Sequence, residues 1–175
     1  MKGLTQSGIL IIVLAFAATV SADETVVQMN LINERGIGKA IGMIALSDTT
    51  TGLKLTPALS GLTPGFHGFH VHERPDCGPG VKDGKIQAGI AAGEHYDPAG
   101  TGKHEGPAGK GHLGDLPYLT VGQDGKASTV LLAPRLKLSD IKGRSFMIHA
   151  GEDNYKDEPA PLGGGGGRVA CGVIK

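Results

Sequence analysis

Thr25–Asn33 (TVVQMNLIN) and Lys39–Ser47 (KAIGMIALS) are two neighbouring segments rich in β-branched and apolar side chains. Such residues favour strands, whereas glycines commonly mark turns. Gly36 and Gly38 lie between the two segments. The sequence therefore predicts a β-hairpin at this point, with its turn at the two glycines.

Further short segments of the same character continue to the C-terminus. They are centred on Leu53 and Leu55, on Phe66, Phe69 and Val71, and on residues 118–121, 128–132, 144–150 and 168–174. No stretch of the sequence has the pattern of a long helix. Seven or eight short strands with turn residues between them predict an all-β domain, built as an antiparallel sandwich or a flattened barrel.

Two long segments interrupt the regular spacing of the predicted strands, namely Glu73–Pro117 and Gly151–Gly167. Loops of this length in a compact domain are usually functional or disordered. The second segment ends in five consecutive glycines, Gly163–Gly167, and a predicted strand follows directly. We therefore expect two long functional loops, and we expect the glycine run to pass close to another part of the structure.

The composition excludes some classes of partner. The 175 residues contain 17 Lys and Arg against 17 Asp and Glu, so the formal net charge is zero with neutral histidine. This balance gives no electrostatic reason to expect binding to nucleic acid or to an anionic membrane. The chain also contains 30 glycines and 10 prolines, which disfavours a helical bundle and favours one loop-rich domain.

The N-terminus has the pattern of a secretory signal. Lys2 precedes ten apolar residues, Ile9–Ala18, and Val20–Ala22 offers small residues for cleavage. An N-terminal membrane anchor is the alternative, but ten apolar residues are short for a span, which needs about 20. We predict a signal peptide at residues 1–22, one domain at residues 23–175, no membrane attachment after cleavage, and a periplasmic location.

The only two cysteines are Cys77 and Cys171. Export exposes a protein to an oxidising compartment, where an even number of cysteines usually forms disulfides. A bridge over so long a loop would stabilise the fold by about 4 to 5 kcal/mol in the chain-entropy description. Two free thiols remain the alternative.

The positions of the histidines are the strongest indication of function in the sequence, because they suggest a metal site. His70 and His72 lie two apart in a predicted strand, so their side chains point to the same face. His95, His104, His112 and Asp115 fall within 21 residues rich in glycine and proline. His149 follows at the end of another predicted strand. Three imidazoles and a carboxylate in one loop match the ligands of tetrahedral zinc.

The number of donors permits two metal ions. Six imidazoles and one carboxylate give seven donors, whereas two four-coordinate ions need eight positions, so one imidazole would have to be shared. Four imidazole nitrogens suit Cu(II), and the set with the carboxylate suits zinc. A mononuclear zinc site and adventitious metal binding by a histidine-rich loop remain open on these grounds.

Several motifs resemble those of the copper,zinc superoxide dismutases, and in particular the bacterial periplasmic branch. The resemblance extends from about Thr25 to Lys175 and keeps the order of the family's motifs. The motifs are GFHGFHVH at 65–72, GHLGDLP at 111–117, DNY at 153–155, PAPL at 159–162 and GGGGGRVACGVI at 163–174.

The resemblance implies an eight-stranded antiparallel Greek-key flattened barrel, similar to an immunoglobulin sandwich, that converts superoxide to dioxygen and hydrogen peroxide. It implies copper and zinc as cofactors, with His95 shared between them. The implied copper ligands are His70, His72, His95 and His149, and the implied zinc ligands are His95, His104, His112 and Asp115.

The resemblance also implies roles for residues that bind no metal. Asp153 would accept hydrogen bonds from histidines on both metals, and Arg168 would attract and orient superoxide. Cys77 and Cys171 match the family disulfide. His67 matches a position with a structural role, in agreement with the expectation that a buried histidine is hydrogen-bonded.

One residue departs from the family pattern. Glu94 precedes the shared histidine where the family often has glycine, and its charge would weaken anion attraction if it faced the copper. Two other functions stay open, a metal-buffering protein without redox turnover and a zinc hydrolase with Glu94 as general base. A homodimer is possible, because paired subunits are common among soluble oligomers.

Overall fold

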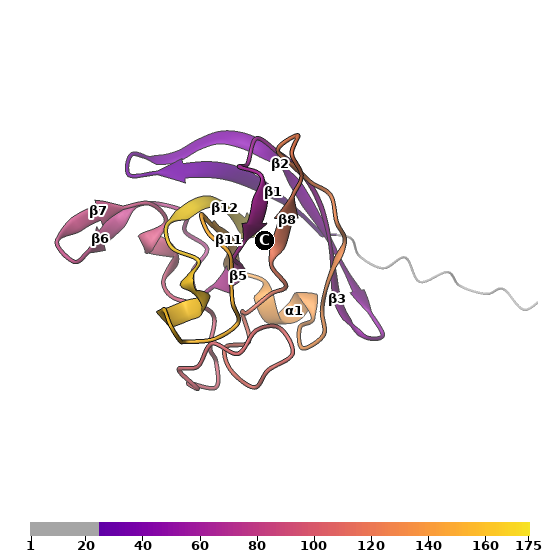
Figure 1. The fold of residues 1–175 in the computed structure, drawn as a ribbon. Coiled ribbons are helices and arrows are strands. Elements are labelled where there is room, and N and C mark those ends of the chain that lie inside the picture. Colours follow the sequence, from indigo (N-terminus) through magenta and orange to yellow (C-terminus); the bar gives the residue numbers. More distant parts are fainter. Residues whose placement is uncertain (1–24) are drawn as a thin grey trace, which may run out of the picture.

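The computed structural model of the chain describes residues 25–175, so the predicted signal peptide at residues 1–22 lies outside the described residues. The described part consists mainly of β-strands and long loops (Figure 1). The strands are β1 (Thr25–Asn33), β2 (Gly36–Thr49), β3 (Gly52–Ser60), β4 (Gly65–His67), β5 (Phe69–His72), β6 (Gly80–Lys82), β7 (Lys85–Gln87), β8 (Leu119–Val121), β9 (Lys126–Ala127), β10 (Leu131–Ala133), β11 (Arg144–His149) and β12 (Arg168–Ile174). The helical turns are η1 (Ile90–Ala92), α1 (Leu138–Ile141) and η2 (Pro161–Gly164).

The predicted hairpin is present as the antiparallel pair β1 and β2. Its turn, however, lies at Glu34 and Arg35, two residues before the predicted position, and β2 already begins at Gly36. The side chain of Asn33 explains the shift, because its Oδ1 accepts a hydrogen bond of 2.7 Å from the backbone N–H of Arg35. Asparagine nucleates turns in this way.

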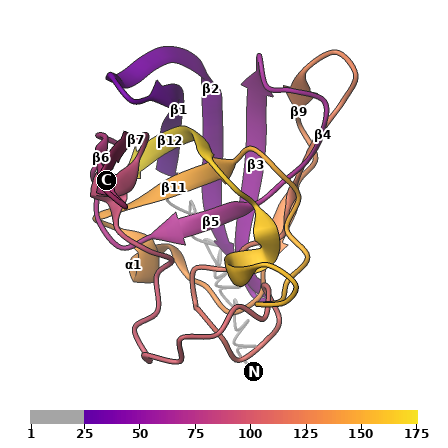
Figure 2. The ribbon, with the colours of Figure 1, turned by 60° about the vertical axis from the view of Figure 1, so that its left-hand side comes forward.

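The main sheet is antiparallel and curls over on itself. Its strand order is β10-β3-β2-β1-β12-β11-β5, with β9 also paired to β3. Viewed as in Figure 2, β5 and β11 run across β2 and β3, so that two walls face each other. The short antiparallel pair β4 and β8 extends the wall that contains β5, because β4 leads into β5 through Gly68. β8 is followed by β9, which pairs with β3 in the other wall. The predicted all-β antiparallel flattened barrel is confirmed.

Apolar side chains from both walls fill the space between them. Phe69 of β5 and Phe146 of β11 are fully buried, and their ring centroids lie 5.1 Å apart. Val27 and Ile44 pair across β1 and β2 and are buried as well. Burial of each such side chain stabilises the folded state by about 1.5 to 3 kcal/mol. The core therefore holds in place the strands that bear the functional residues.

One predicted strand is split in the structure. The sequence predicts a strand at residues 128–132, whereas β9 ends at Ala127 and β10 begins at Leu131. Both strands pair with β3 in one continuous register, and Pro57 of β3 lies opposite the gap between them. Proline has no N–H to donate, so the ladder cannot continue there.

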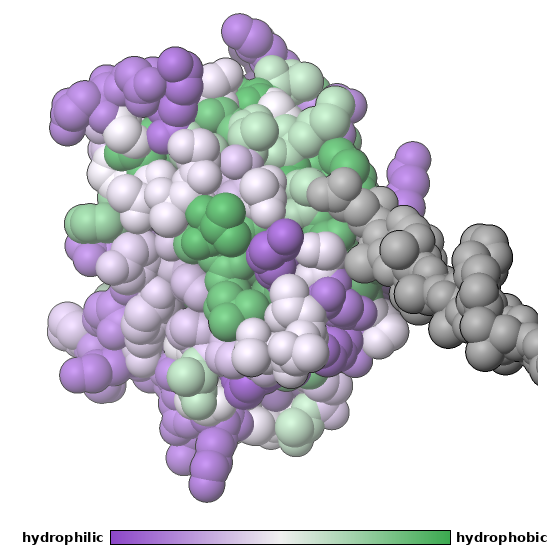
Figure 3. Space-filling view, turned by 90° about the vertical axis from the view of Figure 1, so that its right-hand side faces the viewer, coloured by the Kyte–Doolittle hydropathy of each residue, from purple (hydrophilic) through white to green (hydrophobic). Residues whose placement is uncertain are grey.

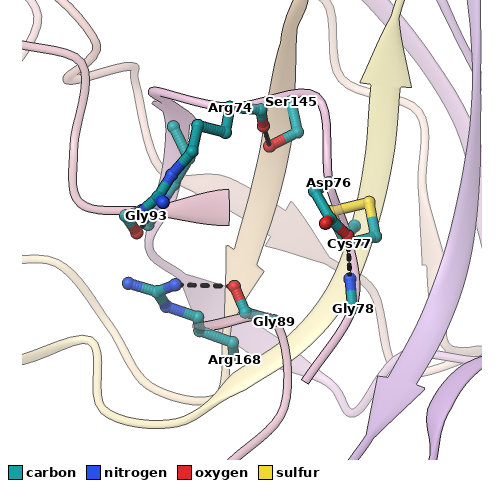
Figure 4. Close-up of a disulfide and its surroundings, with 10 residues drawn as sticks. Arg74, Asp76, Cys77, Gly78, Gly89, Gly93, Ser145 and Arg168 are labelled. Atoms are coloured by element: carbon teal, nitrogen blue, oxygen red, sulfur yellow. Dashed lines mark hydrogen bonds between the residues drawn. A yellow bond between two sulfur atoms is a disulfide. The ribbon is translucent and has the colours of Figure 1, made fainter. Parts of the chain in front are cut away.

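The disulfide between Cys77 and Cys171 is formed, which confirms the predicted pairing and rules out two free thiols. It joins the first long loop to β12 across a sequence separation of 94 residues (Figure 4). The bridge thereby fixes the loop beside the strand that begins with Arg168.

The surface of residues 25–175 contains both apolar and hydrophilic side chains. On the face shown in Figure 3, apolar residues lie in groups among hydrophilic ones. Exposed apolar side chains are common on soluble proteins, so they identify no partner by themselves, and the homodimer stays a prediction. Among residues 25–175, no helix has the length and apolarity to cross a membrane.

Candidate metal centre

Two strands position three of the predicted ligands. His70 and His72 lie on β5 and share one face, while Phe69 and Val71, which alternate with them along the strand, point into the core. β5 pairs with β11, and His149 ends β11 next to this face. Strand geometry thus brings together histidines that are almost 80 residues apart in the sequence.

The first long loop supplies the other ligands and is attached to β5 by backbone bridges. His95 forms an isolated bridge with His72, and Asp115 forms one with His70. The backbone N–H of Val71 donates to Gly114 O at 2.8 Å, which fixes the end of the loop against the strand. The loop therefore lies over the histidine face of β5.

Two overlapping sets of donors result, and every member is buried. In each set, one ligand atom per residue lies within 4.8 Å of the others. The first set consists of His70, His72, His95 and His149, and the second consists of His70, His95, His104 and Asp115. His70 and His95 thus belong to both sets.

The second set differs from the predicted zinc ligands, because it includes His70 where the resemblance implies His112. His70 comes close because its ring stacks on His95 with centroids 3.9 Å apart. His112 is nevertheless present, with its Nδ1 3.4 Å from Asp115 Oδ1. The Nδ1 atoms of His95 and His104 lie 3.2 and 3.0 Å from the same oxygen.

These separations fit a metal ion. Zinc ligands at about 2.0 to 2.1 Å in a tetrahedron lie about 3.3 Å from one another. Three imidazole nitrogens at 3.0 to 3.4 Å from Asp115 Oδ1 match that edge length. A zinc ion fits among His95, His104, His112 and Asp115.

In His72 and His149, one ring nitrogen is hydrogen-bonded to the backbone and the other is free to bind a metal. His72 Nδ1 donates to Gly93 O at 2.9 Å, and His149 Nδ1 donates to Gly166 O at 3.1 Å. The opposite Nε2 atoms of both rings are buried and have no hydrogen-bond partner within the described residues. Such bonds fix the tautomer so that a lone pair faces the metal. Unpartnered ring nitrogens also occur on His70, His95, His104 and His112.

Asp153 connects the two sets. Its Oδ2 accepts from His70 Nε2 at 2.8 Å, and its Oδ1 accepts from His104 Nε2 at 2.8 Å. Its side chain is fully buried. Burial would raise the pKa of Asp153, but hydrogen bonds from His104 and His70 outweigh burial and hold the pKa well below its usual range. Asp153 therefore remains a carboxylate and orients one ring of each set.

His104 differs in protonation from the imidazoles of the first set. Burial lowers the pKa of His149 to about 4, and burial followed by repulsion from His95 holds the pKa values of His70 and His72 well below 6.5. Burial acts in the same direction on His104, but hydrogen bonds to Asp115 and Asp153 outweigh it and raise the pKa of His104 to about 9. At neutral pH the first set is uncharged, whereas His104 of the metal-free protein carries a proton.

A cleft of about 760 Å³ opens on the first set. His95, His149, Arg168, Glu94 and Lys82 are among the residues that line it. Arg168 begins β12 opposite His149, and its Nη1 donates to Gly89 O at 2.7 Å (Figure 4). Its Nη2 lies 3.5 Å from Glu94 Oε2, and the other oxygen of Glu94 lies 3.4 Å from Lys82 Nζ.

The glycine run approaches the centre as expected. Gly163 has a φ of +74°, and a Cβ there would collide with Asp153 Oδ1 and lie 2.7 Å from His104 Nε2. A side chain at this position would separate the two hydrogen-bonded groups. His67 has the structural role implied for it, since its Nδ1 donates to His149 O at 2.7 Å.

Sequence reasoning missed Arg135, which follows β10. Its guanidinium donates to carbonyl oxygens in the loop between His104 and Asp115. No motif marks this residue, because backbone acceptors leave no residue-specific signal in a sequence.

The family model for "Copper/zinc superoxide dismutase (SODC)" matches residues 40–174. A curated relative, superoxide dismutase [Cu-Zn] 1 of Salmonella typhimurium, is 62% identical over 151 residues, which cover 85% of each chain. Superoxide dismutase [Cu-Zn] of Escherichia coli K12 is 52% identical and covers 95% of this chain and 96% of its own length.

Solved structures are similar as well. The Cu/Zn superoxide dismutase from Brucella abortus aligns with a TM-score of 0.86 at 53% identity, over 87% of this chain and 100% of that one. The monomeric copper, zinc superoxide dismutase from Salmonella enterica aligns with a TM-score of 0.79 at 53% identity, with the same coverage.

Proposed function

Because the chain belongs to the copper/zinc superoxide dismutase family, we propose that its two overlapping donor sets form one copper and zinc centre bridged through His95. The reaction of this family converts two superoxide anions and two protons to one dioxygen and one hydrogen peroxide. His70 and His95 belong to both buried sets, but Nε2 of His70 is hydrogen-bonded to Asp153 and only one of its ring nitrogens is free. The bridge is supported most directly by the His95 ring, whose Nδ1 lies 3.2 Å from Asp115 Oδ1 while its buried Nε2 has no hydrogen-bond partner among residues 25–175.

The residues fall into two ligand groups. His70, His72, His95 and His149 would hold copper, since four imidazoles suit Cu(II). His95, His104, His112 and Asp115 would hold zinc, in agreement with their separations. When bound, copper supplies the one-electron redox chemistry of both half-reactions.

His95 is positioned to move a proton. Its Nδ1 lies 3.2 Å from Asp115 Oδ1 in the zinc set, and its Nε2 is buried without a hydrogen-bond partner among residues 25–175. While it is not bound to copper, Nε2 would hold a proton taken from solvent and would give it up when hydrogen peroxide forms, with the second proton coming from solvent. The zinc-side contacts keep the ring in place while this happens.

Arg168 binds and orients the substrate. Its guanidinium lines the cleft with His95 and His149, and the hydrogen bond to Gly89 O holds it there. A fixed cation beside the redox site attracts a small anion and raises the encounter rate, an effect that salt weakens. Glu94 partly offsets this charge, and since its carboxylate contacts Lys82 and Arg168, it is poorly suited to act as the general base of a zinc hydrolase.

The experiment combines metal analysis with a superoxide-consumption assay on residues 23–175. We expect one copper and one zinc per chain with rapid turnover. His72→Ala should abolish turnover and lose copper but keep zinc, because His72 belongs only to the first set. His67→Gln, at a buried histidine outside both sets, should retain copper. Tight metal binding without turnover would refute the assignment and support metal buffering.

The enzyme acts in the periplasm after removal of residues 1–22. The apolar segment Ile9–Ala18 and the disulfide of Cys77 and Cys171 support this location, because such bridges persist in oxidising compartments. Cell fractionation with N-terminal sequencing tests it. A mature protein in the periplasm that begins at Asp23 is expected, and a cytoplasmic protein that begins at Met1 would contradict the proposal.

A further inference from the structure

The loop between His104 and Asp115 carries three of the four proposed zinc ligands but contains no strand or helix. Three backbone hydrogen bonds hold residues 103–115 together, from His112 N to Lys103 O at 2.8 Å, from Gly109 N to Gly106 O at 3.3 Å and from Asp115 N to His112 O at 3.4 Å, and none of them reaches Gly111 O. Gly106, Gly111 and His112 are nevertheless buried. Buried carbonyl groups need donors, since an unpaired one is costly.

Arg135 supplies donors to these carbonyl groups from outside the loop, in addition to the backbone N–H groups that reach Gly106 O and His112 O. Its Nε donates to Pro107 O at 3.1 Å, and its Nη1 donates to Gly111 O at 3.1 Å. Its Nη2 donates to Gly106 O at 3.3 Å and to His112 O at 2.5 Å. One side chain therefore binds four carbonyl groups within seven residues of the loop.

The position of Arg135 is itself well fixed. It lies two residues after the end of β10, which pairs with β3 of the main sheet, and Pro134 restricts the backbone between them. The guanidinium is planar and presents its donors as a rigid fork. The loop is thus tied to the barrel through a rigid group rather than through a strand.

We propose that Arg135 is a positioning residue that holds the segment Gly106–His112 in its metal-binding shape before zinc arrives. One of its acceptors is the carbonyl of His112, a proposed ligand, so Arg135 sets where that ring stands relative to Asp115. A site organised in advance loses less freedom on binding, and zinc therefore binds more tightly and leaves more slowly. This inference rests on the proposed zinc site.

Lysine is the informative replacement, because it keeps the charge but offers one nitrogen in place of the fork. Arg144→Lys is the matched control. Arg144 also donates to two backbone carbonyls, those of Asp140 and Glu73, but both lie outside the loop. A structural loss common to any such arginine would affect both variants equally.

The measurement is zinc affinity of the metal-free protein by chelator competition, together with urea unfolding of the same samples. Arg135→Lys should weaken zinc binding at least tenfold relative to Arg144→Lys, with similar unfolding midpoints. Copper affinity should change less than threefold, because His70, His72 and His149 lie outside the loop. Equal zinc affinity in the two variants would overturn the inference.

Hydrogen exchange gives a second measurement that does not depend on zinc. Amides of residues 103–112 in the metal-free protein should exchange faster in Arg135→Lys than in wild type, and unchanged exchange would overturn the inference. The proposed function fails separately, if wild-type protein binds zinc but does not consume superoxide. Wild-type protein that binds no zinc would overturn both.

Discussion

Replacement of Gly163 by alanine tests whether the close approach of the glycine run to Asp153 matters. Gly163 has a φ of +74°, a conformation that costs alanine about 1 to 2 kcal/mol. The new Cβ would also collide with Asp153 Oδ1 and lie 2.7 Å from His104 Nε2. The hydrogen bond between these groups must then break or lengthen.

The expected magnitude follows from these two effects. A hydrogen bond to a charged group is worth about 1.5 to 3 kcal/mol, so Gly163→Ala should destabilise the metal-free protein by about 2.5 to 5 kcal/mol. Gly164→Ala is the matched control, with a φ of +75° but no contact nearer than 3.6 Å for its Cβ. The control should lose only the backbone cost of about 1 to 2 kcal/mol.

Urea unfolding of the two variants measures the difference, and zinc content after dialysis measures its effect on the site. Loss of an outer hydrogen bond typically weakens metal affinity 10- to 100-fold, so Gly163→Ala should lose zinc more readily than Gly164→Ala. If both variants had the same stability and the same zinc content, Asp153 would not depend on the close approach of Gly163.

The geometry of the site and the disulfide lead to four further predictions. Zinc must displace the proton of His104 when it binds the metal-free protein, so zinc affinity should rise by up to tenfold per pH unit from pH 6.5 to about 9. A chelator titration that shows no such rise would contradict the raised pKa of His104. Because the pKa of His104 is higher in the folded state, its contribution to folding is complete below pH 6.5 and is lost as the pH passes about 9, which unfolding at pH 6 and pH 10 can detect. Azide is a small anion that can probe the cleft beside Arg168. Glu94→Gln should tighten azide binding about 1.4- to 5-fold and steepen the salt dependence of turnover, since an exposed ion pair with Arg168 contributes about 0.2 to 1 kcal/mol. Unchanged azide affinity would show that Glu94 does not compete with anions. Joint replacement of Cys77 and Cys171 by serine should reduce the free energy of unfolding by about 4 kcal/mol in calorimetry or urea titration, and a loss below 1 kcal/mol would show that the bridge is not a main stabiliser.

Local pattern was sufficient for the fold class and for the shared face of His70 and His72. Period-two alternation fixes which side chains share a strand face, whatever the rest of the chain does. The division of the histidines between two metals could not be derived in this way. It depends on how a loop without regular structure folds over β5, and only the family resemblance indicated it.

Two features illustrate what was missed. The hairpin of β6 and β7 turns at Asp83 and Gly84, which have φ values of 54° and 74°, and this dipeptide is a strong hairpin signal that sequence analysis passed over. Arg135 left no comparable signal, because its partners are backbone carbonyls of a distant segment. Contacts of that kind become visible only in three dimensions.

The central claim is that His95 joins two different metals. Anomalous diffraction at the copper and zinc absorption edges, from crystals of the fully loaded protein, tests it most directly. We expect a copper peak beside Nε2 and a zinc peak beside Nδ1 of the same ring. A His95 ring with a metal on one side only, or with the same element on both sides, would contradict the account.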